Sequence, residues 1–141
     1  MKKVELLAPA GDLERLKIAF IYGADAVYIG GEIFGMRSAA KNFNFDDMKE
    51  GVEFAHNLGK KVFVTINIIP RSEELSQLPP YLLELEKIGV DAVIISDPGI
   101  LSVVKNTIPN MEIHISTQGS TSNSMTAEFW YNRGAWTVWH S

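Results

Sequence analysis

A short sequence pattern that recurs along the chain constrains the fold more than any other feature. Tyr22–Val27 and Ile88–Val93 each carry a glycine, an aspartate two residues later, and then the start of an apolar run; weaker copies begin at Leu58 and Arg133. A glycine closes a helix at little cost, and a valine-rich run is typical of a buried strand. The copies recur at roughly 20 to 35 residues, the size of one βα unit. The sequence therefore predicts alternating strands and helices around a parallel sheet.

The same alternation can be followed through the whole chain. We expect strands at Glu5–Ala8, Ala26–Ile29, Lys61–Ile66, Ala92–Ser96, Glu112–Ser116 and Trp136–Trp139. Apolar residues at helical spacing between these strands predict amphipathic helices. Their buried faces contain Leu13, Leu16 and Phe20, then Met48, Val52 and Ala55, then Leu82 and Leu85.

Helix boundaries are marked by residues with suitable backbone chemistry. Asp12, Asn44 and Asp97 are placed to act as N-caps. Pro80 and Pro98 suit a first helical position, which needs no N–H donor. The glycines expected at helix ends are Gly23, Gly59, Gly89 and Gly134.

Composition limits the class of protein. The chain has 141 residues, a formal net charge of −4, 46% hydrophobic residues and no cysteine. Its apolar runs are far shorter than the roughly 20 residues that span a bilayer, and acidic residues interrupt its start before a signal-peptide core develops. We expect a cytoplasmic protein with one domain over residues 1–141 and no membrane partner. The charge balance gives no indication of nucleic acid binding.

Two topologies fit such a chain. An open doubly wound sheet is complete at about this length, whereas a (β/α)₈ barrel needs about 200 residues or more. The expected fifth strand has Glu112, His114, Ser116 and Gln118 on one face, and Ile113, Ile115 and Thr117 on the other. Strands covered by helices on both faces should be apolar on both. We therefore predict a parallel (β/α) barrel-type domain, TIM-like and incomplete with about six βα strands; the open doubly wound sheet is the alternative.

Several motifs resemble those of one protein family, in the family's order. They are Glu5–Asp12, Tyr22–Gly31, Phe34–Arg37, Asn42–Phe43, Val64–Asn67, Ser96–Gly99 and His114–Gln118. Together they span nearly the whole chain, which resembles the opening of the collagenase-like peptidases, peptidase family U32. The resemblance implies a barrel-type N-terminal domain and a protease of unassigned catalytic type.

The resemblance also implies alternatives to proteolysis. Other family members resemble proteins of oxygen-independent hydroxylation that act on tRNA, rRNA or ubiquinone, and some bind an iron–sulfur cluster through cysteines downstream of the matched region. This chain's own residues cannot hold such a cluster, because it has no cysteine; the cofactor is left open. The family's usual continuation after the sixth strand is absent. We therefore expect a partial family member that self-associates through unpaired sheet edges.

Polar residues near the expected strand ends form the candidate site. His114 is a candidate general base or a satisfied interior histidine, and Asp97 is a candidate orienting carboxylate or simply an N-cap. Arg37 can hold an anionic group in bidentate geometry. Asn42, Asn67 and Gln118 are the further substrate-binding candidates.

The sequence contains no established protease motif. His-Glu-x-x-His and Gly-x-Ser-x-Gly are both absent, and no metal site is predicted. Glu5 and Glu112 could form a carboxylate pair inside the barrel, which would be costly there without a cationic partner. The first interpretation is hydrolysis of peptide bonds by an unassigned mechanism, with a peptide or small-molecule substrate. Hydroxylation of tRNA, rRNA or ubiquinone is the second, and a non-catalytic barrel fragment is the third.

Overall fold

The computed structural model describes residues 6–30, 43–66, 76–117 and 137–140. Its strands are β1 (Leu7–Pro9), β2 (Ala26–Gly30), β3 (Lys61–Ile66), β4 (Ala92–Ile95), β5 (Glu112–Thr117) and β6 (Thr137–His140). The helices of these segments are α1 (Leu13–Ile21), α2 (Phe45–Asn57), α4 (Leu78–Ile88) and α5 (Pro98–Thr107).

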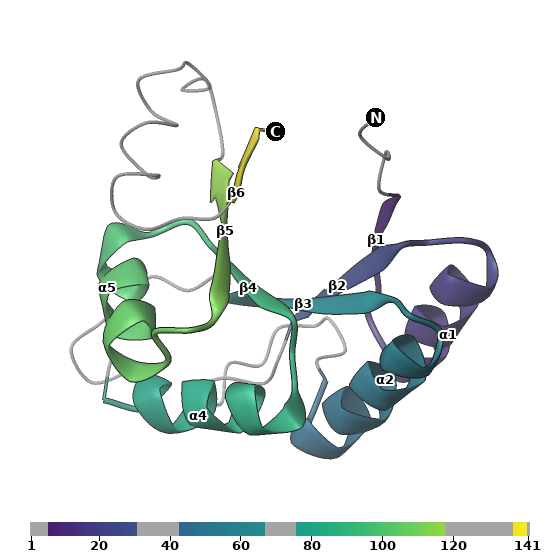
Figure 1. Cartoon of the computed structure of the whole chain (residues 1–141), viewed down its shortest axis with the longest axis horizontal. Coiled ribbons are helices and arrows are strands. Elements are labelled where there is room, and N and C mark those ends of the chain that lie inside the picture. The colour runs from purple at the N-terminus through teal and green to yellow at the C-terminus, as the bar shows by residue number, and fades with distance from the viewer. Residues whose placement is uncertain (1–5, 31–42, 67–75, 118–136, 141) are drawn as a thin grey trace.

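The strands form one parallel sheet in the order β1-β2-β3-β4-β5-β6. This order never reverses, whereas a doubly wound sheet has a switch point where it does. Figure 1 shows α1, α2, α4 and α5 along the same side of the curved sheet. Sequential parallel strands with helices outside are the arrangement of a (β/α) barrel. The predicted barrel-type fold is confirmed, and the open doubly wound alternative does not fit.

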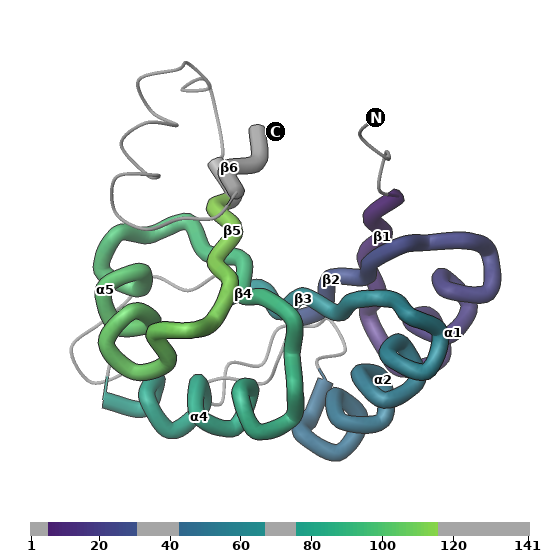
Figure 2. The backbone as a smooth tube through the Cα atoms, in the orientation of Figure 1, coloured from purple at the N-terminus to yellow at the C-terminus, as the bar shows by residue number. Residues whose placement is uncertain are grey.

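Alternate residues of β2, β3 and β4 face two different apolar clusters. Val62 and Val64 of β3, and Ile113 and Ile115 of β5, belong to the large core between sheet and helices. Figure 2 shows the chain passing repeatedly from a strand to an outer helix and back, which builds this layer. A smaller cluster on the opposite, inner face contains Ala26, Phe63, Ala92 and Ile94. The predicted two-faced character of β3 and β5 is confirmed.

The predicted N-caps are also confirmed. The side chains of Asp12, Asn44 and Asp97 each accept a hydrogen bond from the backbone N–H three residues later, at 2.8, 2.8 and 3.0 Å. These bonds satisfy donors that the first helical turn leaves free. Pro98 begins α5 as predicted, but Pro80 is the third residue of α4, which starts two residues earlier than expected.

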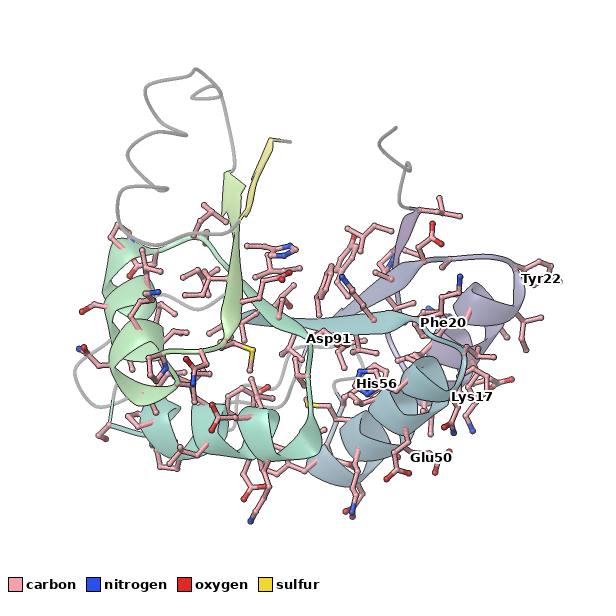
Figure 3. All side chains as sticks on the ribbon, viewed as in Figure 1. Lys17, Phe20, Tyr22, Glu50, His56 and Asp91 are labelled. Atoms are coloured by element: carbon pink, nitrogen blue, oxygen red, sulfur yellow. The ribbon has the colours of Figure 1, made fainter. Side chains whose placement is uncertain are left out.

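The recurrent aspartate of the sequence pattern ties neighbouring strands together. Asp91, which precedes β4, accepts a hydrogen bond from the backbone N–H of Val62 in β3 through Oδ2 at 2.8 Å. The same oxygen lies 2.9 Å from Nε2 of His56, near the end of α2 (Figure 3). Asp91 therefore joins β3, β4 and α2 at the amino ends of the strands.

Asp25 has the equivalent position before β2. Its Oδ2 accepts a hydrogen bond from the backbone N–H of Leu6, just before β1, at 2.8 Å. Its Oδ1 lies 3.3 Å from Nζ of Lys60. The two copies of the pattern thus make the same strand-to-strand connection. At this end of a parallel barrel such residues serve stability rather than catalysis.

The described sheet has β1 and β6 at its edges. Beside β1, Ile18 and Ile21 of helix α1 and its C-cap residue Tyr22 are 43%, 72% and 83% accessible. Figure 3 places Tyr22 at the periphery, away from the sheet. Self-association through these edges stays a prediction. None of the described helices is long and apolar enough to cross a membrane.

Candidate functional site

The inner face of the sheet carries a histidine–carboxylate pair on β5. Nε2 of His114 lies 2.5 Å from Oε2 of Glu112, two residues earlier on the same strand. Side chains at i and i+2 project from the same face of a strand, so β5 presents both groups on the inner side of the sheet. The pair is a short, charge-assisted contact that can hold a proton between an imidazole and a carboxylate.

Apolar side chains of the neighbouring strands surround the imidazole. The His114 ring packs against the Phe63 ring with centroids 4.7 Å apart and an interplanar angle of 57°. In the sheet register, Ile94 of β4 lies directly opposite His114. The His114 side chain is only 8% exposed, whereas that of Glu112 is 29% exposed. Burial, the contact with Glu112 and the packing on Phe63 together restrict the orientation of the His114 ring.

Asp97 is placed differently from His114. Its carboxylate accepts the hydrogen bond from the N–H of Ile100 and caps α5. The carboxylate that contacts His114 is instead that of Glu112. Glu5, the expected carboxylate neighbour of Glu112, lies outside the described residues, and the partner that the structure gives Glu112 is the imidazole of His114.

The predicted substrate-binding residues lie outside the described residues. These are Arg37, Asn42, Asn67 and Gln118. Their roles stay predictions. Within the described segments, no cluster of three or more His, Asp or Glu side chains could hold a metal ion. An iron–sulfur cluster does not fit the residues of this chain, which supply no thiolate ligand.

Sequence reasoning named His114 but missed that Glu112 is its partner. The signal was present, because the alternation of β5 already put both side chains on one face. The sequence alone could not decide between Asp97 and Glu112 as the partner of His114, because both are carboxylates expected near the same site. Only the contact distance distinguishes them.

Tyr81 is a second buried titratable group, on the first turn of α4. It is 7% exposed, and its ring lies 5.6 Å from that of Phe45 at the start of α2. Burial raises the pKa of the Tyr81 hydroxyl well above its usual value. Among the described residues the hydroxyl has no hydrogen-bond partner. The contacts of Tyr81 belong to the helix layer, on the opposite side of the sheet from His114.

Comparison with known proteins supplies the family. The family model of Peptidase family U32 matches residues 11–140. The chain belongs to peptidase family U32. The predicted resemblance is therefore confirmed. The solved structure of the U32 peptidase Mk0906 superposes with a TM-score of 0.71 at 13% identity, covering 98% of this chain and 60% of that one. At that identity the likeness shows the fold alone.

Curated members of the U32 family correct the predicted function. This chain is 49% identical over 133 residues to tRNA hydroxylation protein P1 of Bacillus subtilis, covering 94% of this chain and 32% of that protein. It is 43% identical over 127 residues to the 23S rRNA 5-hydroxycytidine C2501 synthase of Escherichia coli, covering 90% of this chain and 19% of that protein. The chain thus spans about a third or less of the length of these relatives.

These relatives make the protease interpretation wrong as the main function, because their names describe hydroxylation of RNA. The family name indicates proteolysis, whereas the sequence carries neither His-Glu-x-x-His nor Gly-x-Ser-x-Gly. The argument from charge against nucleic acid is also unsupported. A net charge of −4 describes only this segment, whereas phosphate contacts depend on where basic side chains lie across a whole protein.

Proposed function

We propose that this U32-family chain forms the (β/α) barrel part of a protein that hydroxylates a nucleoside of tRNA. The observation that carries the proposal is the 49% identity to tRNA hydroxylation protein P1, which extends over 94% of this chain. The tRNA hydroxylation protein P of Escherichia coli is also 41% identical over 95% of the chain. The match is therefore to the whole described fold and not to one motif.

The pair of His114 and Glu112 on the inner face of the sheet supplies groups that could act on the target base. Enzymes that modify a base within RNA or DNA take it out of its stack into a pocket of the protein. In a barrel such a pocket opens where the strands end, and the inner face lines it. We propose that the target base lies against the side of the sheet that carries His114 and Glu112. An imidazole there can accept a proton or hydrogen bond from the base.

The predicted substrate-binding residues fit the same proposal. Arg37 would hold a phosphate group of the tRNA, because its guanidinium matches phosphate in bidentate geometry. Asn42, Asn67 and Gln118 would contribute hydrogen bonds to the bound nucleotide. These roles are proposals from the sequence, and each can be tested by substitution.

A chimaera tests the proposed function. In tRNA hydroxylation protein P1, the matching 133-residue segment is replaced by this chain, and the chimaera is expressed in a Bacillus subtilis strain that lacks proteins P1 and P2. Nucleosides from purified tRNA and rRNA are then analysed by mass spectrometry. We expect the hydroxylated tRNA nucleoside to return. A stable chimaera that restores none would contradict the proposal, and hydroxylation confined to rRNA would move the substrate to rRNA.

A further inference from the structure

We propose that the inner face of the sheet and its two edges form a docking surface for two further βα units that complete the barrel, and that Glu112 accepts a hydrogen bond from a lysine or arginine side chain on the first added strand. The occupant is a βαβα segment of the U32 fold whose inward-facing side chains are apolar apart from this cation. The docking concerns how the barrel closes, so it holds or fails independently of the proposed function.

The described sheet has six strands, whereas a closed (β/α)₈ barrel has eight. Within the described part of the chain, β1 pairs with β2 alone and β6 with β5 alone, so each edge strand has a side available for pairing. Figure 1 shows β1 and β6 at the two ends of the curved sheet. The U32 fold extends beyond these strands, because the chain covers only 60% of the U32 peptidase Mk0906.

Inward-facing side chains from alternate strands meet, as they do in the filled interior of a barrel. Ala92 of β4 pairs with Phe63 on one side and with Glu112 on the other. Because alanine is small, the Phe63 ring of β3 reaches past β4 to His114 of β5, with ring centroids 4.7 Å apart. By the same alternation, the other flank of the inward side chains of β5 faces the strand that follows β6. A seventh strand would therefore pack against Glu112.

The inner face is partly exposed on the flanks beside its two edges. The apolar cluster at its middle is at most 4% exposed. Leu7 of β1 and Tyr28 of β2 pack against that cluster but are only partly buried. On the other flank, the Glu112 side chain of β5 is 29% exposed. Both flanks border the opening between β1 and β6, where two further strands complete a barrel.

Glu112 indicates the chemistry of the added strand. Its Oε2 contacts Nε2 of His114, whereas Oε1 makes no hydrogen bond with the described residues. Closing the barrel removes this carboxylate from water, which is costly unless a further donor pairs with it. Lysine and arginine side chains supply both donors and positive charge. Glu112 is the first residue of β5, far from the carboxyl ends where a barrel binds its substrate, so the added strand reaches it rather than a base.

A second copy of this chain does not fit the same opening. It can pair with one edge, but it brings six strands where a barrel lacks two. Relatives of this chain have ample length for the missing units, because the match covers only 32% of tRNA hydroxylation protein P1. The segment that fills the opening is therefore a pair of βα units from a U32-family protein.

Hydrogen exchange at single-residue resolution tests the docking, because an amide that pairs with an added strand exchanges more slowly. The Ala10 N–H donates to Tyr28 of β2 at 3.1 Å, so the N–H of Leu7, three residues earlier, points to the free edge of β1. We compare the isolated chain, at a concentration where it is monomeric, with the chimaera of tRNA hydroxylation protein P1. Leu7 should exchange at least about tenfold more slowly in the chimaera. Ala10 is the matched control, because it already has a partner, and its rate should change much less.

Substitution of Glu112 tests the charged contact with the same readout. In the chimaera, Glu112→Gln should lower the protection of Leu7 by about tenfold, since a hydrogen bond to a charged group is lost. Glu112→Lys should lower it further, because two cations then face each other. In the isolated chain neither variant should change the Leu7 rate. Glu86→Gln, on the exposed face of α4, is the control and should change neither protein.

Each contrary result identifies what fails. Equal exchange of Leu7 in the chain and the chimaera would overturn the docking, and so would a chimaera that does not fold under conditions where tRNA hydroxylation protein P1 does. Greater protection in the isolated chain at high concentration than in the chimaera would assign the opening to a second copy. Unchanged protection in Glu112→Lys would refute the cationic contact. A closed chimaera that leaves tRNA unmodified would contradict the proposed function alone.

Discussion

Substitution of Asp91 should destabilise the fold far more than substitution of its histidine partner. The Asp91 carboxylate accepts from the N–H of Val62 at 2.8 Å, and Val62 is fully buried. Asp91→Ala leaves this N–H without its charged acceptor, at a cost of about 2 kcal/mol. The contact with His56 is worth less than about 1 kcal/mol, because the two side chains are 25% and 42% exposed. His56→Ala should therefore cost only about 0.5 kcal/mol.

Urea unfolding of the chain followed by circular dichroism measures both quantities. In thermal unfolding of a chain of this size, the loss of about 2 kcal/mol in Asp91→Ala corresponds to a fall in Tm of about 8 °C. In the double variant, the His56 substitution should add little to the loss from Asp91→Ala, because its partner is already gone. Glu86→Ala, on an exposed surface, is the control and should stay within about 0.5 kcal/mol of the wild type. If Asp91→Ala cost no more than His56→Ala, the argument that the aspartate ties β3 to β4 would be refuted.

Three further predictions concern the helices and the sheet edges. Asp97→Ala should lower stability by about 1 kcal/mol through loss of the α5 cap and leave hydroxylation by the chimaera unchanged; a large loss of hydroxylation would return Asp97 to the catalytic site. Tyr81→Phe should stabilise the chain by about 1 kcal/mol at pH 7 in urea unfolding, because it removes a buried hydroxyl without a described partner. The raised pKa of Tyr81 in the folded state means that the wild type loses stability above about pH 10, where the unfolded tyrosine ionises, whereas Tyr81→Phe lacks this loss. The chain should sediment as an oligomer at micromolar concentration, since β1 and β6 are edges and Ile21 and Tyr22 are exposed; a monodisperse monomer would contradict this.

Local sequence signals predicted most of the fold because each has a local physical cause. The run Lys61–Ile66 is a strand with the predicted bounds, and Ala26–Gly30 extends the prediction by one residue. Asp12 and Asn44 cap helices because a side-chain oxygen reaches N–H groups three residues away. Contacts between residues only three positions apart can be predicted from the sequence, because they do not depend on how distant segments pack.

Contacts between distant segments could not be predicted in the same way. The sequence pattern marked Asp91 as recurrent, but its hydrogen bond to Val62 depends on the register of β3 against β4. The packing of His114 on Phe63 depends on three strands curving together. Even the pairing of Glu112 with His114, only two residues apart, depends on side-chain rotamers that neighbouring strands select.

The function was predicted less well than the fold. A family whose members differ in chemistry gives a reliable architecture, but the reaction depends on the site and on the remaining length of the protein. For this chain the described site is a histidine–glutamate pair on the inner face, with no nucleophile arrangement typical of a protease. The named activities of relatives at 49% and 43% identity then decide against peptide hydrolysis.

The central claim is that this barrel supports tRNA hydroxylation through the inner-face pair on β5. The most direct test compares the wild-type chimaera with its His114→Ala variant in the strain that lacks proteins P1 and P2, at equal protein levels. The account predicts that the wild type restores the hydroxylated nucleoside in tRNA and that the variant leaves it near background. Full hydroxylation by the His114→Ala chimaera would contradict the account.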